Sequence, residues 1–128
     1  MLDKKPIDEE VVRKELIKRF SWIEKEISDR EGEGLIHVEL ALLRSCAEEY
    51  TKQKNFKGLD NIFEFIESLL SQKGLLDPDV LNAIEISFIE DLILAEHPIY
   101  ENAKLHMPHQ LSSLAEEIEK NCKDKKKK

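Results

Sequence analysis

The sequence has few of the residues that build disulfide frameworks, tight turns or membrane spans. Its 128 residues include two cysteines, Cys46 and Cys122, which are too few for a disulfide framework and predict reduced thiols. No segment approaches the ~20 consecutive apolar residues of a membrane span, and the start MLDKKPIDEE lacks the apolar run of a signal peptide. The chain is therefore predicted to be cytoplasmic, with no membrane partner.

Catalytic and metal-binding motifs are missing as well. The sequence contains no HExxH, no CxxC, no glycine-rich phosphate loop and no Ser/His/Asp arrangement. His97, His106 and His109 lie close together with Glu96 nearby, which is a composition that can bind zinc. However, Pro108 breaks the helix between His106 and His109, so these two cannot share one helical face. We therefore predict no enzyme activity, no metal site and no cofactor.

Long helices are what the composition and the apolar spacing favour. Hydrophobic residues make up 41% and charged residues 37% of the chain, which is typical of a globular domain. Only four glycines and four prolines are present, and strict apolar–polar alternation is absent. We predict an all-α fold of about six helices in antiparallel hairpins, as an irregular bundle or a HEAT-like stack. Residues 1–119 would form one domain, and residues 120–128 a lysine-rich disordered tail.

The segment Asp77–Glu96 is predicted to be the central helix. Asp77 is a good N-cap and Pro78 suits the first helical position. At roughly 100° per residue, two opposite apolar strips result, so the helix should be covered on two sides. The first strip contains Val80, Leu81, Ile84, Phe88, Leu92 and Ala95, and the second contains Ile86, Ile89 and Ile93.

Flanking segments give further expectations. Asp8 should begin a first helix whose apolar stripe is Val12, Leu16, Phe20, Ile23 and Ile27. Arg30–Gly34 should form a loop, and His37 should be a surface or capping residue. Gly74 should end the third helix in a left-handed conformation, so that the third and central helices form an antiparallel hairpin.

The charge of the central segment is one-sided. Between Gly74 and Ala103 there are seven carboxylates and no lysine or arginine, which equals the net charge of −7 of the whole chain. One interpretation is a solvated face, and the other is a docking surface for a basic protein. Unmixed like charges repel one another, and a surface of one sign steers association. The docking residues would be Asp79, Glu90, Glu96 and Glu101, with His97 and Tyr100 as anchors.

Two other charged features have alternative interpretations. Glu85 and Asp91 border the apolar strips, so they are either tied structurally, to Arg44 or Arg19, or act as an acid–base pair. The six lysines of residues 120–128 have no interleaved aromatics and predict a solubilising tail or weak, salt-sensitive attraction to anions. No specific nucleic-acid partner is expected.

Three features of the sequence resemble a known family. FEFIESLL at Phe63–Leu70, VLNAIEISFIEDL at Val80–Leu92 and the later Pro108 are similar to small bacterial all-helical proteins of uncharacterised function. Some of those proteins lie in loci that resemble toxin–immunity systems. The resemblance implies an immunity protein that neutralises a basic toxin, such as a nuclease, by occluding its active site. The alternative is a helical adaptor or scaffold protein.

Overall fold

The computed structural model describes residues 7–22, 35–96 and 98–126, and these residues form an all-helical fold. The predicted fold class is therefore confirmed. The helices are α1 (Glu9–Arg19), α3 (Leu35–Lys52), α4 (Phe56–Leu70), the 3₁₀ turn η1 (Lys73–Leu75), α5 (Pro78–Ala83), η2 (Ile84–Glu90), α6 (Asp91–Ile93), α7 (Ile99–Ala103), the 3₁₀ turn η3 (Lys104–His106) and α8 (His109–Lys126). We call the continuous run α5–η2–α6 the central helix.

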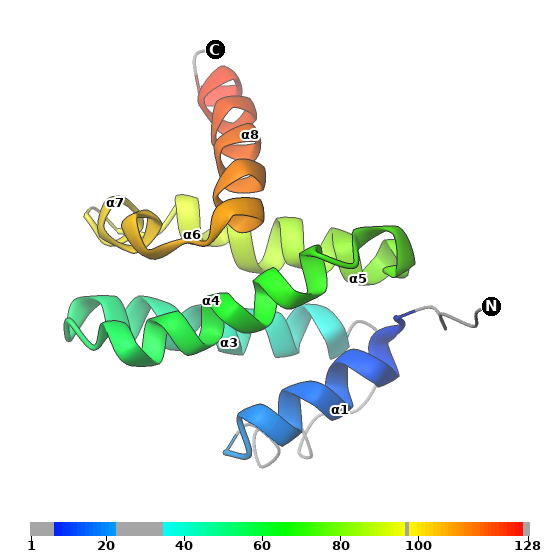
Figure 1. Cartoon of the computed structure of the whole chain (residues 1–128). Coiled ribbons are helices and arrows are strands. Elements are labelled where there is room, and N and C mark those ends of the chain that lie inside the picture. Colours follow the sequence, from blue (N-terminus) through cyan, green and yellow to red (C-terminus); the bar gives the residue numbers. More distant parts are fainter. Residues whose placement is uncertain (1–6, 23–34, 97, 127–128) are drawn as a thin grey trace.

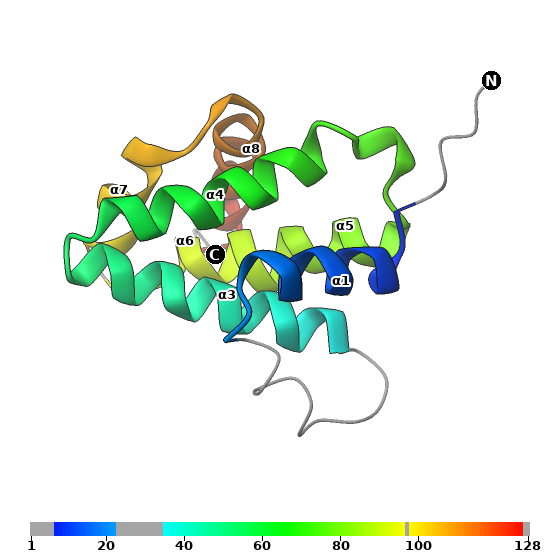
Figure 2. The same ribbon diagram turned by 60° about the horizontal axis from the view of Figure 1, so that its bottom comes forward.

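The other helices lie on two sides of the α3–α4 pair. Figure 1 shows α1 on one side of this pair and the central helix, α7 and α8 on the other, with α8 projecting away from the body. Figure 2 shows α3 and α4 running antiparallel, with the central helix visible between them. The central helix runs antiparallel to α4, as predicted, but packs mainly against α3. In the described part of the chain, no helix is long and apolar enough to cross a membrane.

The core joins four helices through aromatic and aliphatic side chains. Phe63 of α4 meets Phe88 of η2 edge to face, with ring centroids 6.2 Å apart, and Phe20 meets Phe65 in the same way at 5.8 Å. Fully burying one such side chain stabilises a fold by about 1.5–3 kcal/mol. The largest fully buried side chains are Leu16, Ile36, Leu40, Leu43, Leu59, Ile62, Phe63, Phe65, Ile66, Ile84 and Phe88.

The first helix begins as predicted, and hydrogen bonds hold its N-terminal end in place. The Asp8 carboxylate accepts a hydrogen bond from the Val11 N–H at 3.0 Å, and the apolar stripe Val12, Leu16 and Phe20 is buried. Ahead of the helix, the Ile7 N–H donates to the Leu75 carbonyl at 2.7 Å, and the Asp77 N–H donates to the Ile7 carbonyl at 2.9 Å. Ile23, Ile27 and the predicted Arg30–Gly34 loop lie outside the described residues.

The central helix is not a regular α-helix, although it begins as predicted. The Asp77 carboxylate accepts from the Asp79 N–H at 2.9 Å and Pro78 occupies the first turn. The seven residues Ile84–Glu90 are π-helical. A π-helix bonds each N–H to the carbonyl five residues back, so each turn holds more residues than the 3.6 of an α-helix.

This change of period corrects the predicted second apolar strip. Ile86 was expected to be covered, but its side chain is 42% exposed, whereas Ser87 is only 8% exposed. Ile89 is fully buried and Ile93 is half-buried. The prediction for Ile86 is wrong because an angle of 100° per residue does not apply within the π-helical turns.

The helix-end prediction at Gly74 is also wrong. Gly74 lies in η1 without a left-handed φ, whereas Lys54, after α3, has a φ of 60°. The Asn55 N–H donates to the Tyr50 carbonyl at 2.8 Å and the Lys54 N–H to the Thr51 carbonyl at 3.1 Å. These are the two hydrogen bonds of a Schellman motif, with lysine at the position that usually holds glycine.

Replacing Lys54 by glycine is expected to raise the free energy of unfolding by about 1 kcal/mol, because an L-residue with a side chain is strained at this φ. Urea denaturation monitored by circular dichroism measures the change. The matched control is Lys52→Gly, at the last helical residue of α3, which should lower stability by about 0.5–1 kcal/mol. Equal effects of the two glycines would show that the left-handed conformation at Lys54 carries no strain.

The last helix extends further than predicted. α8 runs to Lys126 and so includes most of the segment 120–128 that was predicted to be a disordered tail. Lysine is a good helix former, and cations near a helix C-terminus interact favourably with the helix dipole. Both effects favour continuing the helix through the lysines.

Candidate functional site

The acidic residues predicted to dock a partner lie along the central helix and α7. Asp79 is exposed at the start of α5, Glu90 is half-buried at the end of η2, and Glu96 is exposed after α6. No lysine or arginine in the described part of the chain pairs with these three carboxylates. These three carboxylates are thus not neutralised by lysines within residues 7–22, 35–96 and 98–126.

Of the two predicted anchors, the structure describes only Tyr100. Tyr100 is only 3% exposed, and its hydroxyl donates to the Glu119 carboxylate at 3.2 Å. Its ring is part of the core, so the prediction that Tyr100 contacts a partner is wrong. His97 lies outside the described residues.

The structure adds acidic residues that the sequence did not indicate. Burial raises the pKa of the Tyr100 hydroxyl, and the carboxylates of Glu119, Glu116 and Glu101 raise it further. These three side chains therefore gather around Tyr100, with Lys104 as the nearby cation, 3.9 Å from Glu119 and 5.6 Å from the Tyr100 ring centroid. Glu101, which is exposed, was predicted, but the contribution of α8 follows only from the fold.

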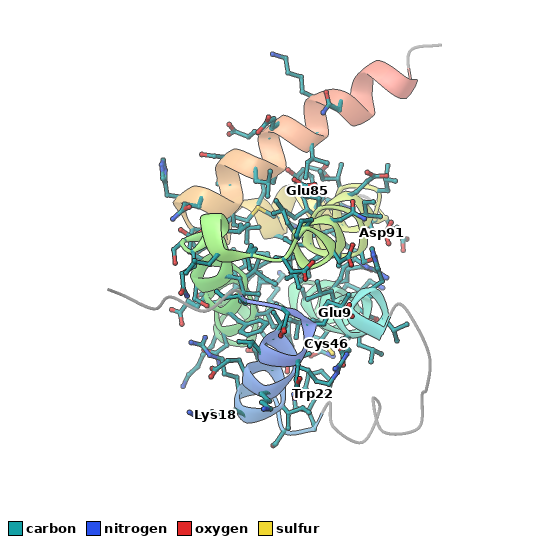
Figure 3. All side chains as sticks on the ribbon, turned by 90° about the vertical axis from the view of Figure 1, so that its right-hand side faces the viewer. Glu9, Lys18, Trp22, Cys46, Glu85 and Asp91 are labelled. Atoms are coloured by element: carbon teal, nitrogen blue, oxygen red, sulfur yellow. The ribbon has the colours of Figure 1, made fainter. Side chains whose placement is uncertain are left out.

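Glu85 and Asp91 do not form a site. Figure 3 shows Glu85 beside α8 and Asp91 on a different side of the same helix. Glu85 is half-buried and Asp91 is exposed. The suggested arginine ties are absent among the described residues, because Arg44 pairs with Glu48 and Arg19 lies over the Phe65 ring.

The described histidines do not come together in one site. The His106 ring stacks on Phe56 with centroids 4.2 Å apart, and its Nδ1 lies 3.6 Å from the Asp60 carboxylate. His109 is exposed at the start of α8. His37, predicted at the surface, is half-buried, and its Nδ1 lies 2.7 Å from Ser87 Oγ in the π-helical segment. Among the described residues, no three histidine, cysteine or carboxylate side chains are grouped to hold a metal ion.

A buried ion pair joins α1 to α3, and sequence reasoning missed it. Glu39 is 0% exposed, and its Oε2 accepts from Arg13 Nε at 2.5 Å, while Oε1 has no partner among the described residues. Burial raises the pKa of the Glu39 carboxyl; the hydrogen bond and charge of Arg13 oppose this, and Glu9 adds to the rise. A carboxylate among apolar residues of a helix face gives no signal of burial until a cation from another helix is placed against it.

An aromatic cleft of about 470 Å³ opens between the ends of α1, α3 and α4. It was also not predicted, because its residues come from three separate segments. Its lining residues are Arg19, Phe20, Trp22, Tyr50, Gly58, Asn61 and Glu64. Volumes between about 300 and 1,000 Å³ are usual for sites that hold small molecules or parts of a peptide.

The comparison with known proteins gives a family but no relative of known activity. A family model described as a domain of unknown function, DUF7674, matches residues 13–123, from the second turn of α1 to the C-terminal part of α8. No curated protein and no solved structure matches the chain. Since the matched region covers most of its length, the chain belongs to the DUF7674 family.

Proposed function

We propose that this chain is a protein-binding module that captures a basic protein through the acidic side of the central helix and α7. The observation that carries the proposal is that Asp79, Glu90 and Glu96 have no cationic partner in the described part of the chain. Carboxylates left unpaired on a chain of net charge −7 attract cations and raise the association rate with a basic surface, by ~10–10³-fold at low salt.

Affinity would come from apolar contact within this acidic surface. Aromatic or aliphatic side chains that become fully desolvated usually contribute most of the binding free energy, and exposed charges contribute specificity and speed. Tyr100 is buried in the core, so it cannot supply this apolar contact with a partner. Leu94, 49% exposed between Asp91 and Glu96, is the apolar side chain best placed for this contact.

We further propose that the partner is a toxin with a basic active site, such as a nuclease, and that this chain is a bacterial immunity protein acting in the cytoplasm. The resemblance of Phe63–Leu70 and Val80–Leu92 to proteins from toxin–immunity-like loci supports this form of the proposal. The carboxylates would pair with the lysines and arginines that bind the toxin's substrate and so occlude its active site.

Reversing two charges tests the surface. Glu90→Lys/Glu96→Lys should slow association with the partner by about tenfold or more at low salt and make the rate less dependent on ionic strength. Glu15→Lys/Glu49→Lys is the matched control, because it makes the same change of net charge at exposed acids of α1 and α3. The partner is isolated by affinity capture on the full chain from its native cells, and stopped-flow mixing gives the rates.

The result separates a local from a general charge effect. Equal slowing by both double variants would show that net charge alone matters and would contradict an acidic docking surface. The captured protein is then expressed alone and with this chain. Growth arrest that co-expression relieves would support the immunity role, and a non-toxic partner would support an adaptor instead.

A further inference from the structure

The aromatic cleft has the chemistry of a site for a cationic side chain. Trp22 is 43% exposed at the cleft, although its ring also meets Phe20 edge to face with centroids 6.4 Å apart. Tyr50 forms a second aromatic wall. Aromatic rings attract cations through the negative face of the ring, and tryptophan does so most strongly.

The position of Tyr50 is fixed by Gly58. A Cβ atom at Gly58 would lie 2.9 Å from the Tyr50 ring, so the ring rests directly on the glycine backbone. Gly58 is held in the first turn of α4, where its N–H donates to the Asn55 side chain at 3.2 Å. The aromatic wall therefore depends on the absence of a side chain at this position.

The polar groups of the cleft point to a positive occupant. Glu64 is exposed on α4, and its carboxylate has no hydrogen bond or ion pair with another described residue. Asn61, one turn earlier, offers an amide oxygen. The one cation in the lining, Arg19, is already placed over the Phe65 ring, 5.6 Å from its centroid. The unpaired charge in the cleft is thus negative.

We propose that this cleft binds an arginine side chain of a protein partner, with the guanidinium against Trp22 and Tyr50 and paired with Glu64. Arginine fits because its planar group stacks on aromatic faces and donates several hydrogen bonds to a carboxylate at the same time. The volume of about 470 Å³ accommodates the side chain together with flanking peptide. The residues that line the cleft come from the ends of α1, α3 and α4, and none of them belongs to the central helix or α7, so the cleft is separate from the acidic docking surface.

Trp22 is the only tryptophan of the chain, so its fluorescence reports on this cleft alone. The probe is the peptide acetyl-glycyl-arginyl-glycinamide, titrated at constant ionic strength into the full-length protein. The same peptide with citrulline in place of arginine is the neutral control. We expect a saturable change of emission with a dissociation constant in the millimolar range, and binding of the citrulline peptide at least about tenfold weaker.

Two substitutions, one that removes a negative charge and one that removes a positive charge, test the charge of the group that the cleft binds. Glu64→Gln should weaken binding roughly three- to tenfold, and Arg19→Gln should strengthen it about two- to fivefold by removing a like charge. Glu117→Gln removes an exposed carboxylate from the distant α8 and should change nothing. Thermal unfolding of each variant confirms that it is folded, and backbone amide chemical shifts give a second measure of binding.

The opposite pattern would overturn the proposal. If Arg19→Gln weakens binding and Glu64→Gln strengthens it, the cleft prefers an anionic group. Equal binding of the arginine and citrulline peptides would show that charge is not recognised. If neither the fluorescence nor the amide shifts of α4 saturate across the millimolar range, the cleft does not bind arginine.

Discussion

Replacing Arg13 by alanine is expected to destabilise the protein by about 3 kcal/mol, because it leaves the Glu39 carboxylate buried without its cation. Glu39 is 0% exposed, and in the described part of the chain Arg13 Nε is its one hydrogen-bond partner, at 2.5 Å. A buried charge that loses its partner costs far more than an exposed pair that is broken. Denaturant unfolding of the wild type and the variant measures the difference.

Two further variants identify the cause. Lys14→Ala removes the cation of the exposed pair with Glu10, on the same helix, and should change stability by about 0.5 kcal/mol or less. Arg13→Met/Glu39→Leu replaces both charges by apolar groups and should restore most of the lost stability or exceed the wild type. If the double replacement is as unstable as Arg13→Ala, the loss comes from packing around α1 and not from the buried charge.

The same pair predicts a pH dependence. The pKa of Glu39 in the folded state is raised above its ordinary value of 4.5, so the folded state binds this proton more tightly than the unfolded state does. Stability from this group is therefore fully present below pH 4.5 and is lost as the pH rises through the folded-state pKa. The stability of the wild type relative to Arg13→Met/Glu39→Leu should fall over that window. A rise would contradict the direction of the shift.

The second large effect is expected at Phe88, in the π-helical segment. Phe88→Ala should lower the free energy of unfolding by about 3–5 kcal/mol, because the side chain is fully buried and its loss leaves a cavity beside Phe63. Ile86→Ala, two residues earlier and 42% exposed, is the control and should cost about 0.5 kcal/mol or less. Urea unfolding of both variants gives the comparison.

A double-mutant cycle with Phe63→Ala examines the contact itself. The edge-to-face rings, 6.2 Å apart, should give a coupling free energy of about 0.5–1.5 kcal/mol beyond the loss of buried area. Additive effects would mean that the two rings do not act on one another. A large cost of Ile86→Ala would instead place Ile86 inside the core and contradict the π-helical register.

Local signals were enough to predict the helical fold. Asp8 and Asp77 cap helices as their side chains and positions suggested, and the stripes of Val12, Leu16 and Phe20 and of Val80, Ile84 and Phe88 are buried. Capping and apolar periodicity involve residues a few positions apart, so they can be read without knowledge of the fold.

The features that were mispredicted or missed from the sequence depend on residues far apart in the chain or on an unusual backbone conformation. Glu39 looks like a surface residue until Arg13 of another helix is placed against it, and Tyr100 looks exposed until α8 covers it. The cleft draws Trp22, Tyr50 and Glu64 from three segments. Acidic residues could be counted from the sequence, but the addition of Glu116 and Glu119 from α8 required the fold.

The π-helical segment Ile84–Glu90 also affects how this chain should be aligned with its relatives. Each hydrogen-bonded turn of a π-helix encloses one more residue than the same turn of an α-helix. A relative with a regular α-helix here would therefore reach the same geometry at Asp91 with a shorter segment. An alignment that allows a gap between Ala83 and Asp91 would keep the buried positions on both sides in correspondence, whereas an ungapped one would match exposed positions with buried ones.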